Sequence, residues 1–264
     1  MSALFVVGML ILGGAVGLIS SALGLGGGIF MVPAFFEFVP GMDAGTAKGT
    51  SLFIIVFVAA VNVWRLNRGH SDRHWGLAAV IASGSIVGAY ASGWATSLLR
   101  GTAVLWPFIG LLGLIGARTF FLKEIRIDDE DVRRRFLVAV LIGVATGIVA
   151  GATGVGGGAI LVPLALLAGI VTNERVVALS NTVMVATCAA GALAHFRAER
   201  VADLPWVYGQ VNIALVPLVF IGAQVAGPFG KWINERLPLH RRKVVMGLLL
   251  IVIAGRMVYR ALTG

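Results

Sequence analysis

The sequence predicts an all-α polytopic membrane protein made of two inverted-topology repeats, and three observations support this fold class. The 264-residue chain is 58% hydrophobic and only 12% charged, about half the charged fraction of a soluble domain. Residues 1–36 and 136–173 contain no Asp, Glu, Lys or Arg, and each stretch exceeds the roughly 20 apolar residues that cross a bilayer. Both stretches also carry the same glycine pattern, which indicates an internal duplication.

The duplication has an offset of 130 residues, at which GLISSALGLGGGIFMVPAF (17–35) aligns with GIVAGATGVGGGAILVPLA (147–165). The shared positions near the centre of the motif are Gly24, Gly26, Gly27, Gly28 and Pro33 in the first copy, and Gly154, Gly156, Gly157, Gly158 and Pro163 in the second. We therefore divide the chain into repeat 1 (1–122), a charged cytoplasmic linker (123–135) and repeat 2 (136–264).

Each repeat is predicted to begin with a Gly-rich helical hairpin and to continue with three transmembrane helices. In repeat 1 these are the hairpin 3–40 and the helices 47–66, 76–99 and 103–122. In repeat 2 they are the hairpin 136–171 and the helices 176–195, 205–227 and 244–262. The second arms of the hairpins span about 20 Å at 1.5 Å per residue, which is too short to cross a bilayer comfortably. Pro33 and Pro163 lie in these arms and are predicted to shape the hairpins.

The topology follows from three loops that hold most of the basic residues, at 65–75, 123–135 and 231–243. The positive-inside rule places all three in the cytoplasm. This requires each glycine-linked pair of segments to cross the membrane an even number of times, either as a re-entrant hairpin or as two tilted passes. Each repeat then crosses an odd number of times, so the repeats have opposite orientations, and a substrate site is expected between them near the midplane.

The glycine clusters have two interpretations. Glycine permits close helix packing in membranes, as expected for the Gly13/Gly17 and Gly143/Gly147 pairs. Alternatively, each cluster forms a non-helical turn, and a new helix begins near Gly28 or Gly158. The free N–H groups and the positive end of such a helix bind anions. Because no strand precedes the clusters, they are not dinucleotide-binding loops.

Small polar residues near the clusters are candidates to line an anion site or, equally, to form ordinary helix–helix hydrogen bonds. These residues are Ser21, Thr50, Ser51, Thr153, Ser180 and Asn181. Lys48 begins the segment that contains Thr50 and Ser51, so it could serve as a charge partner for the anion. The alternative is that its ammonium snorkels to the membrane interface.

Other classes of function find little support in the sequence. Cys188 is the single cysteine and is expected to pack as a small hydrophobe. The four histidines are scattered without metal-ligand spacing, so no structural zinc is expected. The net charge of +9 reflects cytoplasmic loops rather than nucleic acid binding. No cofactor is expected, and exposed GxxxG faces would suit either a homodimer or packing within one chain.

The doubled GxGGG(x)4P motif, GTSL at 49–52 and the basic central loop resemble the sulfite exporter TauE/SafE family of bacterial membrane transporters. The resemblance implies an inner-membrane permease for small sulfur-containing or organic anions such as sulfite, sulfonates or sulfoacetate. The cytoplasmic placement of the basic loops puts both termini on the periplasmic side. It assigns substrate binding to the glycine motifs, Thr50 and Ser51. The second repeat departs from GTSL, because LSNT (179–182) places Asn181 opposite Ser51. We expect a secondary transporter working by alternating access, with an anion channel, or a membrane enzyme or assembly factor in sulfur metabolism, as the alternatives.

Overall fold

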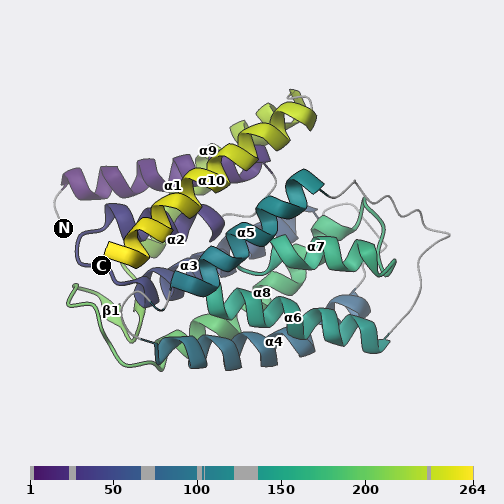
Figure 1. Ribbon diagram of the computed structural model, residues 1–264, viewed down its shortest axis with the longest axis horizontal. Coiled ribbons are helices and arrows are strands. Elements are labelled where there is room, and N and C mark those ends of the chain that lie inside the picture. Colours follow the sequence, from purple (N-terminus) through teal and green to yellow (C-terminus); the bar gives the residue numbers. More distant parts are fainter. Residues whose placement is uncertain are drawn as a thin grey trace.

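The computed structural model describes residues 3–23, 28–66, 75–99, 103, 105–121, 136–236 and 239–263. Within these residues the chain forms helices joined by short connections, and one two-stranded hairpin (Figure 1). The helices of the first half are α1 (Ala3–Leu23), α2 (Gly28–Phe38), α3 (Ala44–Leu66), α4 (Trp75–Ser97) and α5 (Trp106–Phe121). The second half contains α6 (Phe136–Thr153), α7 (Gly158–Leu167), α8 (Val176–Phe196), β1 (Val207–Tyr208), β2 (Val211–Asn212), α9 (Leu215–Arg236) and α10 (Leu239–Thr263).

Five of the helices contain segments long and apolar enough to cross a membrane, namely Ala3–Ser21, Ala44–Leu66, Trp75–Ser97, Phe136–Thr153 and Val176–Phe196. Large apolar side chains such as Leu4, Leu137 and Leu262 are about 70–80% exposed on the outside of the bundle. Such a surface is stable only when hydrocarbon covers it. The predicted all-α polytopic membrane protein is therefore confirmed.

One predicted helix is displaced by ten residues. The apolar run at 205–227 indicated a helix throughout, but α9 begins at Leu215. The preceding residues form the β1–β2 hairpin, in which Val207 pairs with Asn212. Gly209 at the turn has a φ of 56°, and Trp206 has a φ of 63°. These left-handed conformations are incompatible with an α-helix. The apolar segment instead forms a hairpin in which Val207 and Val211 are buried, whereas Trp206 and Tyr208 are exposed.

The third basic segment is also mostly helical, whereas a loop was predicted at 231–243. Helix α9 continues to Arg236, and α10 begins at Leu239. Arg236 stacks on Trp232, with its guanidinium carbon 3.8 Å from the centre of the ring. This cation–π contact stabilises the polar last turns of α9, which extend beyond its apolar part at Leu215–Gly230. Most of the first two basic segments lies outside the described residues, which do not include 67–74 and 122–135.

The first helix of each half packs on a helix of the other half. Helix α1 packs on α9, and α6 packs on α4, so the first helix of each half contacts the fourth helix of the other. Both contacts are so close that a Cβ on Gly17 would lie 2.6 Å from the Cα of Ala223, and one on Gly147 would lie 2.8 Å from the nitrogen of Ala89. The packing role expected for Gly17 and Gly147 is confirmed. In Figure 1, α4 and α6 run side by side along the lower edge, and α1 and α9 lie at the top.

The centre of the bundle contains α3 and α8, which pack against each other. They are antiparallel, because Gly49 of α3 lies next to His195 at the end of α8, and Asn62 lies next to Asn181 near its start. Beside them lie the short helices α2, with 11 residues, and α7, with 10. At 1.5 Å per residue these helices are about half the length needed to cross the hydrocarbon core. Their starts lie inside the protein, next to the buried Gly28 and Gly157, whereas Phe38 and Leu167 at their ends are exposed.

Candidate functional site at the glycine loop

The loop between α6 and α7 is a true break in the helical backbone. Gly154, Gly156 and Gly157 have φ values of 78°, 86° and 80°. This left-handed region costs other L-residues roughly 1–2 kcal/mol each, so glycine is needed at these positions for conformational reasons. Gly157 is the N-cap of α7, which begins at Gly158. The predicted turn followed by a new helix is therefore present in the second half.

The N–H groups of this loop are only partly used by the protein. Gly154 donates to the carbonyl of Ala150, and the N–H groups of Ile160 and Leu161 both donate to the carbonyl of Gly157. Among the described residues, none accepts a hydrogen bond from the N–H groups of residues 156–159. Unpaired N–H groups at the start of a helix, together with its dipole, create a local positive potential.

Helix α3 braces the other side of the loop with two buried side chains. The hydroxyl of Ser51 donates to the carbonyl of Gly154 over 2.8 Å. The ammonium of Lys48 donates to the carbonyl of Ala152, also over 2.8 Å. Both side chains are at most 1% exposed. The expectation that Lys48 snorkels is wrong, because its cation occupies the C-terminal end of α6, where unpaired carbonyls favour a positive charge.

The start of α2 lies against the same loop. A Cβ on Gly28 would lie 2.6 Å from both the Cα and the carbonyl oxygen of Val155. Helix α2 therefore begins in contact with the loop that leads into α7, although the two helices come from different halves. Gly24, Gly26 and Gly27 of the first cluster lie outside the described residues.

Several predicted site residues bond to the protein itself. Thr50 is fully buried, and its hydroxyl oxygen accepts from the N–H of Asn212 over 2.9 Å. Thr153 donates to the carbonyl of Val149 over 2.7 Å. Ser21 faces α9, where a Cβ on Gly227 would lie 3.5 Å from its hydroxyl oxygen. Neither threonine forms a helix–helix hydrogen bond here, because Thr153 bonds within α6 and Thr50 bonds to β2.

The two predicted residues on α8 have different surroundings. Ser180 lies at the start of α7, where a Cβ on Gly158 would be 3.2 Å from its hydroxyl oxygen. Asn181 instead accepts from the side-chain amide of Asn62 over 3.1 Å, which links α8 to α3. The residues that meet at the loop are therefore Gly28, Lys48, Ser51, Ser180 and the second glycine cluster.

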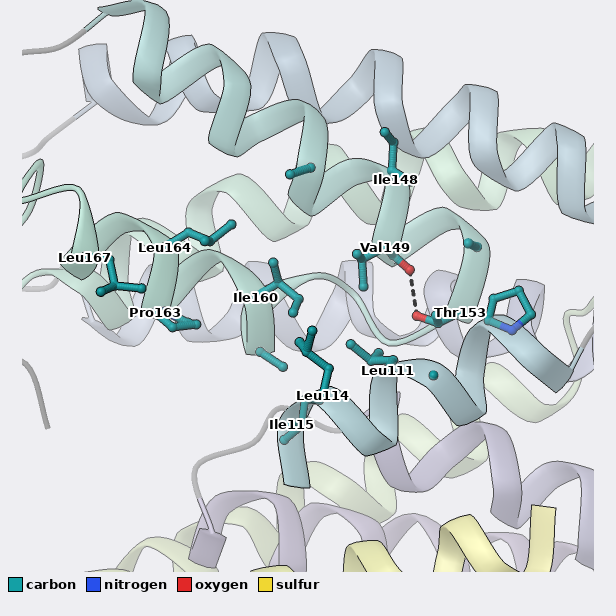
Figure 2. A pocket seen from close by; sticks show the side chains of 15 residues that line it. Leu111, Leu114, Ile115, Ile148, Val149, Thr153, Ile160, Pro163, Leu164 and Leu167 are labelled. Carbon is teal, nitrogen blue, oxygen red and sulfur yellow. Dashed lines mark hydrogen bonds between the residues drawn. The ribbon is translucent and has the colours of Figure 1, made fainter. Parts of the chain in front are cut away.

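A large apolar groove adjoins this loop between α5, α6 and α7 (Figure 2). It has a volume of about 790 Å³ and is walled by residues such as Leu111, Leu114 and Leu164. Figure 2 shows Thr153 at its inner end, with the hydroxyl turned to Val149. An ion in such a groove would lose its hydration without compensation. The groove therefore suits hydrocarbon rather than an ion.

Sequence analysis missed His195, which it classed with the scattered histidines. Its side chain is fully buried between α3 and the β1–β2 hairpin. Its Nδ1 is 2.9 Å from Oε1 of Gln210, and Gln210 donates from Nε2 to the carbonyl of Ser97. An ionisable residue near the end of a long apolar segment is a signal that the sequence does contain.

Helices long enough to span a bilayer, together with short helices that begin at a glycine break inside the protein, define a multi-pass membrane protein of the transporter class. The chain belongs to the family described as sulfite exporter TauE/SafE, whose model matches residues 9–257.

The relatives of the chain are named as membrane transporters. The chain is 27% identical over 248 residues to "Probable membrane transporter protein MJ0441" of Methanocaldococcus jannaschii, and the match covers 91% of both chains. It is 26% identical over 281 residues to "Probable membrane transporter protein YunE" of Bacillus subtilis, which covers 96% of this chain and 97% of the relative. No solved structure matches the chain. The chain is accordingly a membrane transporter by family.

Proposed function

We propose that the chain is a secondary transporter for a small sulfur-containing or organic oxyanion, such as sulfite, a sulfonate or sulfoacetate. The observation that carries this proposal is the glycine loop before α7, where the N–H groups of residues 156–159 have no acceptor among the residues that the structure describes. Backbone N–H groups at a helix N-terminus can hold an oxyanion without a buried arginine. The family description adds the sulfur chemistry to this anion preference.

The anion is held, in this proposal, between the two glycine hairpins. The contact of Gly28 with Val155 supports it, because it brings the start of α2 to the loop before α7. Ser51 and Ser180 would position the anion, and Lys48 would supply a nearby positive charge. The Gly-rich tip at 24–27 would close the site from the other repeat.

Alternating access would follow from inverted-topology repeats, which rock around a shared site. The equivalent contacts of α1 with α9 and of α6 with α4 support such a symmetry. In Figure 1 the first turn of α1 and the last turn of α10 lie at the left, whereas the end of α9 and the start of α10 lie at the upper right. This arrangement agrees with the basic segments in the cytoplasm and the termini on the periplasmic side of an inner membrane.

The test is a flux assay in proteoliposomes with sulfite, sulfoacetate, taurine, sulfate and a short carboxylate. We expect flux of at least one anion that saturates with concentration and that shows trans-stimulation, because a transporter site must reorient in each cycle. Flux that rises linearly without saturation would instead identify an anion channel. A folded preparation that carries no anion in the panel would overturn the proposal.

A further inference from the structure

Two buried polar atoms have no hydrogen-bond partner among the described residues, and one of them is Nε2 of His195. The other is the hydroxyl of Thr146, which cannot change its charge. Buried polar atoms in proteins are nearly always paired, so an orphan in a transporter requires an explanation. His195 is the more informative of the two, because an imidazole can take up a proton near neutral pH.

The hydrogen bonds around His195 determine which ring nitrogen carries its hydrogen. Gln210 donates from Nε2 to the carbonyl of Ser97 over 3.1 Å. Its Oε1 is therefore the atom that faces Nδ1 of His195 at 2.9 Å. An amide oxygen only accepts, so the hydrogen of the neutral ring lies on Nδ1. Nε2 is left as a bare, buried base.

The surroundings of Nε2 can hold a proton but do not supply one. His195 lies beside the carbonyl of Gly151 in the last turn of α6, which would accept from a protonated Nε2. The charged groups that act on the ring are Lys48 on α3 and Asp43 just before α3. The carboxylate of Asp43 already accepts from the N–H groups of Gly45 and Thr46. Among the described residues, the ring lies next to the neutral Gln210 of the β1–β2 hairpin and the Gly151 carbonyl of α6, and Gln210 in turn donates to the carbonyl of Ser97 at the end of α4.

Lys48 links this base to the glycine loop. Its ammonium donates to the carbonyl of Ala152, one residue after Gly151. A second positive charge on His195 is unfavourable beside the ammonium of Lys48, because the two cations repel in a site of low dielectric constant. An anion at the N–H groups of residues 156–159 would offset this repulsion. Binding of the anion and binding of the proton therefore favour each other, as linkage requires.

We propose that Nε2 of His195 is the proton-binding site through which the protein moves one proton together with each anion. The proposal rests on the transporter function proposed above and deepens it by naming the coupling ion. The proton bonds to the lone pair of Nε2 and leaves from the same atom, and no other bond changes. Because His195 and Lys48 are at most 1% exposed here, the proton enters and leaves in other conformations of the cycle.

The key variant is His195→Asn. The Asn amide nitrogen can take the place of Nδ1 and keep the bond to Gln210, but the variant has no group in place of Nε2. Thr146→Val is the matched control, because it removes the other orphaned polar atom at nearly constant volume and without loss of a titratable group. Both are reconstituted with sulfoacetate on both sides of the membrane, and protein-free liposomes provide the background.

With the membrane potential clamped at zero, a one-proton symporter accumulates its anion about tenfold on the alkaline side per unit of pH gradient. We expect this accumulation from the wild type and from Thr146→Val. His195→Asn should keep anion exchange at equal pH but lose the accumulation. Accumulation by His195→Asn, or its absence from the wild type despite saturable exchange, would overturn the assignment of the proton site and leave the transporter function intact.

A second measurement does not depend on flux. In ¹⁵N-histidine NMR of the protein in nanodiscs, His195→Asn identifies one signal pair among the four histidines. We expect a hydrogen on Nδ1 and a bare Nε2 without anion, and protonation of Nε2 when sulfoacetate is added at acidic pH. A hydrogen on Nε2 from the start, or no change with anion, would contradict the proposal. If no variant and no wild type carries any anion, the transporter function fails and the NMR result still decides whether His195 binds a proton.

Discussion

Ser51 and Gly154 are 103 residues apart in the sequence, and the hydroxyl of Ser51 donates to the carbonyl of Gly154 over 2.8 Å inside the bundle. Ser51 belongs to the first half of the chain and Gly154 to the second, so this bond ties α3 of one half to the glycine loop of the other. It orients a carbonyl of the loop, and the N–H groups of residues 156–159 have no acceptor among the described residues. The geometry of the candidate anion site therefore depends on a contact between the halves.

The first prediction concerns this bond. Ser51→Ala removes the donor and leaves the Gly154 carbonyl buried without it, which costs roughly 1–3 kcal/mol. We expect a lower melting temperature in detergent and a weaker affinity for the transported anion. Ser83→Ala is the control, because Ser83 is exposed and donates only to Val80 within α4. Equal anion affinity in the two variants would show that Ser51 does not contribute to anion binding.

A second prediction tests the left-handed backbone at the start of α7. Gly157→Ala forces a Cβ into a conformation with φ of 80° and to within 2.6 Å of Cγ2 of Thr146. We expect a strain of about 1–2 kcal/mol and a loss of anion affinity larger than this loss of stability implies. Thermal unfolding and a binding assay on the same preparation give the two values.

The matched control for that substitution is Gly8→Ala in α1, where no atom lies within 4 Å of the new Cβ. Because alanine is a better helix former, Gly8→Ala should stabilise the protein by up to about 1 kcal/mol and leave binding unchanged. Parallel losses of stability and of binding in Gly157→Ala would favour a pure packing role for the glycine loop.

The pair formed by Asn62 and Asn181 links α3 to α8 over 3.1 Å. A double-mutant cycle with Asn62→Ala and Asn181→Ala should give a coupling of about 0.6 kcal/mol, the average for polar contacts between membrane helices. Thermal unfolding provides the measurement. A much larger loss of anion binding in Asn181→Ala than in Asn62→Ala would show that Asn181 also contacts the anion.

The last prediction concerns Cys188, which is fully buried, with its sulfur 3.8 Å from the carbonyl of Gly156. We expect no reaction with a maleimide in the folded protein and rapid labelling after denaturation, because a thiol reacts only where it is accessible. Cys188→Ala should keep saturable anion flux. Loss of flux in a stably folded Cys188→Ala would revive the membrane enzyme as an alternative, since this is the single thiol of the chain.

Periodicity and charge predicted most helices closely, because a membrane helix is defined by local properties. The segments predicted at 47–66, 76–99 and 176–195 correspond to α3, α4 and α8, with ends displaced by at most three residues. The first ten residues of the segment predicted at 205–227 are not helical, because apolar composition does not distinguish a partly buried hairpin from a helix. Only the backbone at Trp206 and Gly209 makes that difference visible.

The candidate site was predictable in part. The glycine repeat alone indicated the break at 154–157, because the residue type is tied to a backbone conformation. The surroundings of Lys48 and His195 could not be predicted in this way. Lys48 was expected at the interface but is bonded to Ala152, and His195 was passed over although it is fully buried. Their partners are distant in sequence, so no local pattern identifies them.

The sequence by itself determined a membrane-embedded, duplicated, helical chain with glycine breaks, because hydrophobicity and backbone freedom are properties of single residues and short segments. The tertiary structure decided which polar groups form hydrogen bonds within the protein and which remain available to a ligand. Thr50 and Thr153 are occupied, whereas the N–H groups after Val155 and Nε2 of His195 have no protein partner among the described residues. Hydrogen bonding is a property of pairs, and the pairs that fix the glycine loop, Ser51 with Gly154 and Lys48 with Ala152, form between the two halves.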